Sequence, residues 1–229
     1  MVGIIGAMDV EIDGIKAEMT EVSVKTVAGL DFYKGYLNGV PCVTARCNPG
    51  KVNAAACAQI MALEYRPRLI INPGVAGGIG PDVHIGDVVI GTNCLQHDID
   101  TSFFGDAIGF ISGVGIVKTP CDPGTLKTLE NHAKKIFKGK VMPGTIVTGD
   151  QFINYSAKCA QLHRDFGALA CEMESGAIAH ICYINQIPFA AVRSISDNAD
   201  DDAGADYMTF VQTAAKDAIE LINSVITEI

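Results

Sequence analysis

The chain has 229 residues, of which 48% are hydrophobic and 19% charged, and its formal net charge is −9. The hydrophobic fraction supports a folded core and excludes an intrinsically disordered chain. The negative charge, without a cluster of Lys and Arg, argues against partners such as nucleic acid or an anionic membrane surface. No apolar run reaches the roughly 18 residues of a membrane-spanning helix, and the first residues do not resemble a signal peptide, so we expect a cytoplasmic protein.

Short runs rich in Val and Ile alternate with longer segments of helical periodicity, a pattern typical of strands covered by helices. The predicted strands are 2–6, 32–37, 40–46, 69–72, 86–91, 144–148, 168–171 and 189–194. The predicted helices are 8–19, 50–65, 123–137 and 173–185, followed by a long helix with an apolar face from Tyr207 to Val225. The glycine-rich stretch 98–120 has no clear period, and we expect a functional or interface loop there.

The sequence shows no composition break, internal repeat or linker. It therefore predicts one domain over residues 1–229, with a three-layer α/β/α architecture and a mixed, mostly parallel central sheet. Eight cysteines are scattered without a CxxC motif or a Cys/His cluster. We expect them to be buried free thiols in a reducing cytosol, and we expect no metal site.

Carboxylates and glycines follow several of the predicted strands. Glu11 comes shortly after the first strand, a glycine-rich segment at 73–78 follows the fourth, and Asp197 follows the last. In open α/β sheets ligands bind beyond the carboxyl ends of the strands. Lys and Arg are scarce at these ends, so the site favours a neutral or cationic ligand with hydroxyl groups. The sequence lacks a P-loop, a GxGxxG motif and a GxSxG motif.

Five blocks in this order resemble the 5′-methylthioadenosine/S-adenosylhomocysteine nucleosidases of the nucleoside phosphorylase superfamily. The blocks are GIIGAM at 3–8 with Glu11, NPGVAGG at 72–78, TGDQFI at 148–153, EME at 172–174 and RSISD at 193–197. The resemblance extends from residue 1 to about residue 210. It implies a nucleoside phosphorylase-like fold and hydrolysis of the N-glycosidic bond of adenosyl thioethers, without a cofactor.

The resemblance also implies roles for individual residues. Asp197 is the acid that protonates N7 of adenine, and Glu11 is the base that activates water. Glu174 accepts the ribose hydroxyls, while Phe152 stacks on adenine. The further residues implied in substrate binding are Met8, Gly77, Phe104, Ile153, Glu172, Met173, Arg193, Ser196 and Tyr207.

The segment from His97 to Gly105 resembles a family segment that reaches the neighbouring subunit, which implies a homodimer with Phe104 acting in trans. Two positions depart from the family pattern: Val75 stands where several members have Ser, and Pro49 lies in a block that is more usually Gly-Ile-Gly. The first departure removes one hydrogen bond expected from the family pattern, and the second implies a different shape of the alkylthio pocket. The sequence leaves open the ranking of methylthioadenosine, S-adenosylhomocysteine, 5′-deoxyadenosine and futalosine-type nucleosides as substrates.

Three other functions remain compatible with the sequence. A phosphorylase of the same superfamily would use phosphate in place of water. A nucleoside-binding module would hold adenine without releasing it. A metal-dependent phosphohydrolase would use His97, Asp98 and the aspartate run at 200–202, but the other histidines show no ligand spacing around this group.

Overall fold

The computed structural model describes residues 1–200 and 203–229. Its strands are β1 (Val2–Gly6), β2 (Thr20–Val27), β3 (Leu30–Leu37), β4 (Val40–Arg46), β5 (Leu69–Gly78), β6 (Val88–Gln96), β7 (Thr119–Pro120), β8 (Val141–Thr148), β9 (Ala168–Glu172) and β10 (Phe189–Asp197). Its helices are α1 (Asp9–Glu18), α2 (Lys51–Tyr65), the 3₁₀ helix η1 (Ser102–Phe104), α3 (Pro123–Ile136), α4 (Ser156–Phe166), α5 (Ser175–Ile184) and α6 (Ala203–Val225).

The central sheet is mixed, as predicted, and strand β5 organises it. The first residues of β5 pair in parallel with β1, and residues along most of its length pair in parallel with β10. Its last two residues, Gly77 and Gly78, pair in antiparallel fashion with β9. The strand order is β10-β6-β8-β9-β5-β1-β4-β3-β2, and the added β10–β5 pairing closes part of the sheet into a ring. Several strand ends therefore meet around the end of β5.

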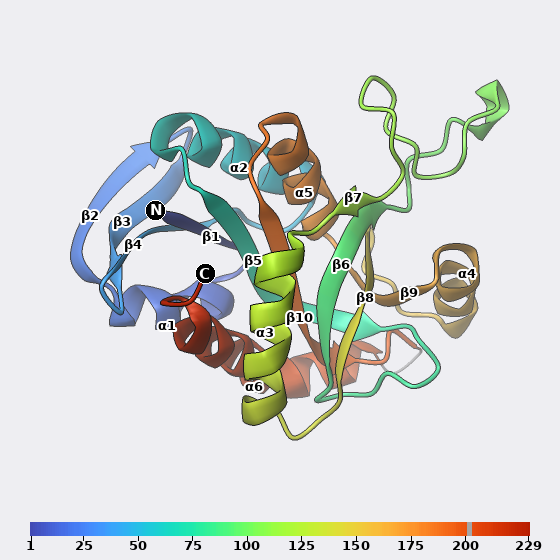
Figure 1. Ribbon diagram of the computed structural model, residues 1–229. Helices are drawn as coiled ribbons and strands as arrows, with labels where there is room; N and C mark the ends of the chain where they lie inside the picture. Colours follow the sequence, from blue (N-terminus) through green and yellow to red (C-terminus); the bar gives the residue numbers. More distant parts are fainter. Residues whose placement is uncertain (201–202) are drawn as a thin grey trace.

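Helices cover both faces of the sheet, as Figure 1 shows, with α1, α3 and α6 on one face and α2 and α5 on the other. The alternation of side chains along a strand explains the two cores. In β1, Ile4 joins the core with Ile222 of α6, while Ile5 joins the core with Ile178 of α5. This is the predicted three-layer α/β/α arrangement.

Local sequence signals fix the helix ends nearest the sheet. The carboxylate of Asp122 accepts hydrogen bonds from the backbone N–H of Thr125 at 2.7 Å and from its hydroxyl at 2.8 Å, and Pro123 follows at the start of α3. Such a cap satisfies N–H groups that have no partner within the helix. Helix α2 ends at Tyr65, and the residue after it, Arg66, lies in the left-handed region with a φ of 46°.

Several elements differ from the sequence prediction. Strand β5 continues past residue 72 to Gly78, and β6 spans Val88–Gln96 where residues 86–91 were predicted. Both strands are extended by neighbours that are distant in sequence. Strand β2, strand β7 and helix α4 were not predicted. Strand β2 is exposed along almost its whole length, and α4 is short and mostly polar and buries only Cys159 and Leu162.

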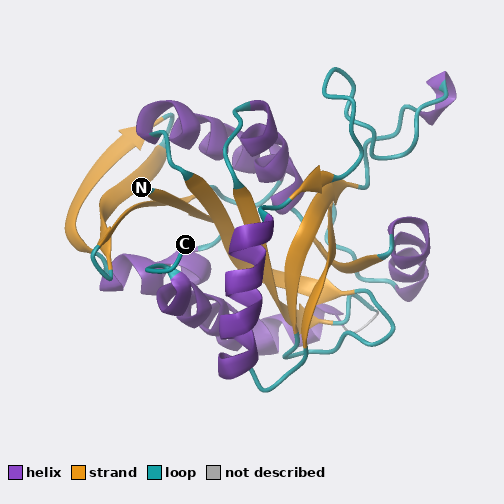
Figure 2. Ribbon diagram, viewed as in Figure 1, coloured by secondary structure: helices purple, strands orange, loops and turns teal. Residues whose placement is uncertain are grey.

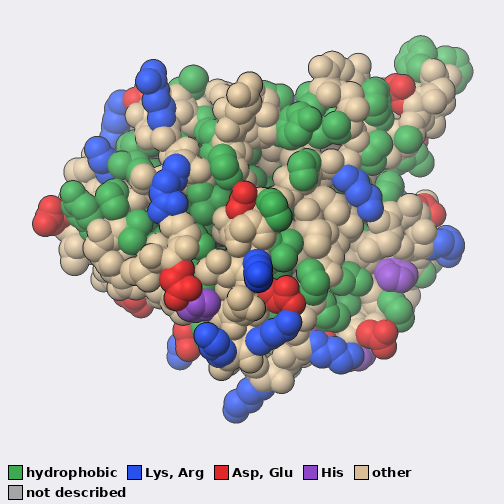
Figure 3. Space-filling view, in the orientation of Figure 1, with side chains coloured by type: hydrophobic (Ala, Val, Ile, Leu, Met, Phe, Trp, Pro, Cys, Tyr) green, Lys and Arg blue, Asp and Glu red, His purple; other side chains and the backbone are tan. Residues whose placement is uncertain are grey.

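A long segment between β6 and β7 projects from the body of the molecule and carries η1 near its tip (Figures 1 and 2). Phe103 and Phe104 of η1 are 92% and 80% exposed, and hydrophobic side chains gather at this tip in the space-filling view (Figure 3). The predicted irregular stretch 98–120 corresponds to this segment and to β7.

All eight cysteines are free and buried, as predicted. Across the described residues, no helix has both the length and the apolar character needed to cross a membrane.

Candidate active site

A cavity of about 210 Å³ lies where the ends of β1, β5, β9 and β10 meet. It is lined by ten of the residues singled out from the sequence, which are Met8, Glu11, Gly77, Phe152, Glu172, Met173, Glu174, Ser196, Asp197 and Tyr207. Both departures from the family pattern, Pro49 and Val75, also line it. The prediction that strand ends deliver carboxylates to one place therefore matches the geometry.

Glu11 lies in the first turn of α1 and is buried. One carboxylate oxygen, Oε2, accepts hydrogen bonds from the backbone N–H groups of Ala7 at 2.7 Å and Met8 at 3.0 Å. The other, Oε1, accepts from the N–H of Val75 at 3.2 Å. Burial raises the pKa of Glu11, although the positive charge of Arg193 and these hydrogen bonds oppose the rise. The side chain thus holds the start of α1 and also presents a carboxylate that readily takes up a proton.

Asp197 is the last residue of β10 and is buried as well. Its Oδ2 accepts a hydrogen bond from the hydroxyl of Ser196 at 2.9 Å, and its Oδ1 accepts from the N–H of Ala199 at 2.9 Å. Burial raises the pKa of Asp197 above that of an ordinary aspartate. A Cβ at position 77 would lie 2.9 Å from Oδ1, so only glycine at position 77 leaves this carboxylate room beside β5. The group is placed to act as a general acid.

Glu174 precedes α5 and accepts a hydrogen bond from the N–H of Gly50 at 2.8 Å. Burial and the neighbouring charge of Glu172 raise the pKa of Glu174 to about 8. Glu172 is bound differently, because its Oε2 accepts a hydrogen bond from Arg193 Nη2 at 2.7 Å in an ion pair of buried side chains. Glu172 therefore borders the cavity, but its carboxylate is paired with Arg193.

Two aromatic rings face each other at the cavity. Phe152 and Tyr207 meet edge to face, with ring centroids 5.8 Å apart and an interplanar angle of 78°. The hydroxyl of Tyr207 donates to the sulfur of Met8 at 3.0 Å. Phe152 is half exposed, so it leaves a flat apolar surface that a planar ligand could cover.

Three of the predicted residues do not line this cavity. Arg193 is fully buried behind it, and the side chain of Ile153 packs in a separate core with Ile79 and Leu95. Phe104 lies on η1, in the projecting segment. Conversely, sequence reasoning missed the residues that hold Arg193 and Glu172, which are Asn72, Thr148 and Ser175. Their positions beside strand ends were the available signal, but small polar residues are common at such places.

The metal alternative finds little support in the described residues. Asp98 accepts a hydrogen bond from Lys51 at 2.6 Å and another from the N–H of Asp150 at 3.0 Å. Over residues 1–200 and 203–229, no three His, Cys, Asp or Glu side chains gather so as to hold a metal ion. Asp201 and Asp202 of the acidic run lie outside the described residues.

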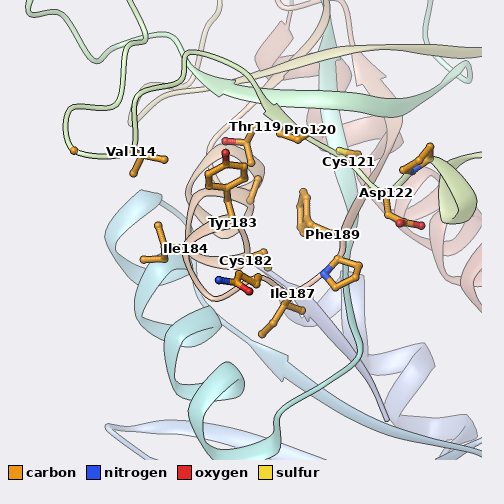
Figure 4. Close-up of a pocket in the computed structure, with 15 residues that line it drawn as sticks. Val114, Thr119, Pro120, Cys121, Asp122, Cys182, Tyr183, Ile184, Ile187 and Phe189 are labelled. Atoms are coloured by element: carbon orange, nitrogen blue, oxygen red, sulfur yellow. The ribbon is translucent and has the colours of Figure 1, made fainter.

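A larger cavity of about 770 Å³ lies between β7, the end of α5 and the segment at 113–114 (Figure 4). Cys121, Tyr183 and Phe189 are among the residues around it. Its one acidic side chain is Asp122, which already caps α3. Size alone does not make a reaction site, and the convergent carboxylates belong to the smaller cavity.

Comparison with known proteins agrees with this geometry. The family model described as "Phosphorylase superfamily" matches residues 1–227. A 5′-methylthioadenosine/S-adenosylhomocysteine nucleosidase from an Exiguobacterium species is 36% identical over 98% of this chain and 96% of its own length.

Two solved structures have the same fold. The nucleosidase of that name from Neisseria meningitidis, in complex with methylthio-immucillin-A, superimposes with a TM-score of 0.95 at 33% identity and covers 100% of this chain and 99% of its own. The futalosine hydrolase of Helicobacter pylori superimposes with a TM-score of 0.94 at 28% identity, covering 100% and 97% of the two chains. With its cavity of buried carboxylates, this chain belongs to the 5′-methylthioadenosine/S-adenosylhomocysteine nucleosidase family of the phosphorylase superfamily.

Proposed function

We propose that this chain is an N-glycosyl hydrolase that cleaves 5′-methylthioadenosine and S-adenosylhomocysteine to adenine and the corresponding thioribose. The observation that carries the proposal is the set of three buried carboxylates, Glu11, Glu174 and Asp197, each with a raised pKa, around one cavity. Relatives named for this activity match the chain over almost its whole length. Cleavage of a glycosidic bond by water needs an acid on one side and a base on the other.

The reaction uses the two acidic residues in complementary forms. The oxygen of a water molecule bonds to C1′ of the ribose as the bond from C1′ to N9 of adenine breaks. Glu11, ionised, takes the proton that the water loses, and Asp197, protonated, gives its proton to N7, so adenine leaves as a neutral molecule. Each proton transfer of this kind typically contributes about 10²–10⁴-fold to the rate.

The other residues hold the nucleoside in place. Glu174 accepts hydrogen bonds from the ribose hydroxyls, and Met173 packs under the sugar. Phe152 stacks on adenine while the backbone of Ile153 reads its edge. Ser196, which donates to Asp197 at 2.9 Å, keeps that carboxyl aimed at N7. Arg193 acts on the water through Glu11, and Tyr207 covers the 5′ side together with Met8.

We also propose that the working unit is a homodimer in which Phe104 completes the pocket of the neighbouring subunit. The exposure of Phe103 and Phe104 at the tip of a projecting segment supports this, because apolar tips of this kind are usually covered by a partner.

Residues 1–229 would act as one domain, since β5 pairs with strands from both halves of the chain. Eight free buried thiols support a cytoplasmic location.

The proposal is tested by measuring adenine release in phosphate-free buffer that contains a chelator. The substrates are methylthioadenosine, S-adenosylhomocysteine, 5′-deoxyadenosine and futalosine, and the products are separated by chromatography. We expect adenine and free thioribose from the first two substrates. Release only after phosphate is added would point to a phosphorylase, and release only with a metal to metal-dependent hydrolysis. Binding of adenine without any release would make the chain a binding module.

A further inference from the structure

Arg193 is a buried cation whose two terminal nitrogens both have several hydrogen-bond partners, while its Nε has none among the described residues. Its Nη1 donates to the backbone carbonyls of Asn72 at 2.7 Å and Val192 at 2.8 Å. Its Nη2 donates to the hydroxyl of Ser175 at 2.7 Å, to Glu172 at 2.7 Å and to the side-chain oxygen of Asn72. Both terminal nitrogens of the guanidinium are therefore held in one orientation. A planar guanidinium whose two terminal nitrogens are both hydrogen-bonded has little freedom to rotate.

Asn72 and Ser175 are in turn fixed by their own bonds. The Nδ2 of Asn72 donates to the carbonyl of Ile5 at 2.6 Å, which leaves its Oδ1 facing Arg193. The hydroxyl of Ser175 lies 3.1 Å from Asn72 Oδ1 and 3.0 Å from Glu172 Oε2. Asn72 thus joins β5 to the end of β1, and Ser175 joins the start of α5 to Asn72 of β5 and to Glu172 of β9. Together with Arg193 of β10, the network connects the four strands whose ends form the cavity.

The same network lies next to the proposed base. A Cβ placed on Gly74 would be 2.5 Å from Glu11 Oε1 and 3.3 Å from Arg193 Nη1, so the carboxylate and the guanidinium approach the same point of β5. Among the described residues, the titratable groups that interact with Glu11 include, besides Arg193, Glu174 before α5, Tyr207 on α6 and Cys47 after β4. Of these five residues, Arg193 is the one that carries a positive charge. Its charge lowers the pKa of Glu11 against the opposing effect of burial.

We propose that Asn72 and Ser175 are positioning residues, which hold the guanidinium of Arg193 beside Glu11 and so keep this carboxylate ionised for the reaction. The proposal rests on the proposed function, because it concerns the base of that reaction. Neither residue is among those that line the cavity. Their effect is exerted through Arg193, whose charge counts for more in a buried site than it would in water.

The test compares Ser175→Ala with Ser194→Ala. Ser175→Ala removes the hydroxyl from Arg193 and Glu172 but keeps the backbone N–H of residue 175 on Glu172, so the fold should survive. Ser194 follows Arg193 in β10, is equally buried, and its hydroxyl has no hydrogen-bond partner, which makes it a matched control. Asn72→Ser is a second variant that disturbs Arg193 from another side.

Two readouts separate positioning from a merely structural role. The first is a ¹³C NMR titration of protein labelled at the glutamate carboxyl carbons, in which the signal of Glu11 is identified by its loss in Glu11→Gln. The second is the acid limb of the pH profile of kcat/KM for adenine release from methylthioadenosine. For Ser175→Ala we expect the Glu11 titration to move to higher pH and kcat/KM on the acid limb to fall about threefold or more. Ser194→Ala should leave both readouts unchanged.

A purely structural role of Asn72 and Ser175 would give a different result. If Ser175→Ala and Asn72→Ser lower the Tm but leave the titration of Glu11 in place, the two residues serve the fold alone and the proposal is overturned. If wild-type protein releases no adenine, the proposed function fails, while the NMR titration still decides whether the network sets the ionisation of Glu11.

Discussion

Asp197 combines burial with two hydrogen bonds, and its burial raises its pKa. In Asp197→Asn the amide keeps the size of the side chain but has no acidic proton for N7. We expect kcat to fall by about 10²–10⁴-fold while the nucleoside still binds. Turnover is measured by adenine release and binding by calorimetry, with Asp165→Asn on the surface of α4 as control. Near wild-type kcat in Asp197→Asn would remove this residue from the mechanism.

Glu174 gives the folded protein a pH dependence that can be read without substrate. Its pKa is about 8 in the folded chain against 4.5 for an ordinary glutamate, so the folded state binds the proton more tightly. Stability from this group is therefore complete below about pH 4.5 and is lost as the pH rises to about 8. Glu174→Gln stays neutral throughout, and it should have a higher Tm than wild type at pH 8 but a similar Tm at pH 5.

Thermal melts of the substrate-free protein test this, and each kcal/mol corresponds to about 2–4 °C for a chain of this size. Glu18→Gln, at an exposed position of α1, is the control. An equal Tm difference at pH 5 and pH 8 between Glu174→Gln and wild type would show that Glu174 titrates like an exposed carboxyl.

Among individual residues, the carboxylates around the cavity could be predicted from the sequence, whereas the residues that hold them by hydrogen bonds and ion pairs could not. Glu11, Glu174 and Asp197 stand out because strand ends gather at one edge of the sheet. The ion pair of Glu172 with Arg193 could not be predicted, since a carboxylate at a strand end looks the same whether it faces a ligand or a buried cation. Asn72 and Ser175 became visible only through their hydrogen bonds.

Strand β5 shows how one element shapes the site. The strand was predicted to end at residue 72, before a glycine-rich segment, yet it continues to Gly78 because β10 pairs with it as far as Gly77. Pro73 and the glycines after it hide this part of the strand from sequence-based prediction, because both residue types are rare in strands. Pairing with a strand more than 100 residues later is information that local periodicity does not contain. Elements marked by signals close in sequence were located closely, such as the apolar strands β1 and β4, and the alanine-rich α2 between Gly50 and Pro67.

The glycines of β5 give a prediction about geometry. Gly74→Ala would place a methyl group 2.5 Å from Glu11 Oε1, so the carboxylate must move. We expect kcat/KM to fall about tenfold to a hundredfold, because small displacements of a reacting group are costly. In the control Gly91→Ala of β6, the new Cβ meets only side-chain atoms at 3.2 Å or more. The Tm of both variants is measured beside their activity, and only Gly74→Ala should lose activity. Equal activities would show that the position of Glu11 is not critical.

The whole molecule is completed by a second copy, if Phe104 acts in trans as proposed. A hybrid dimer of one Glu11→Gln subunit and one Phe104→Ala subunit then contains one intact site, which joins Glu11 of the second subunit with Phe104 of the first. Mixing the two variants under conditions of subunit exchange should raise activity well above the mean of the separate variants. Activity that stays at the mean would place Phe104 in its own subunit's site or outside any site.

The burial of all eight cysteines has a consequence for the chemical durability of the molecule. Thiol reagents attack the thiolate, and burial raises the pKa of Cys57 to about 12 and of Cys159 to about 11. Iodoacetamide should therefore label the native chain only as fast as the chain opens, and the rate of labelling measures that opening. An unfolded chain exposes all eight thiols at once. A mild oxidant that spares the folded enzyme would therefore cross-link the unfolded chain through disulfides and hold it unfolded until a thiol reductant is added.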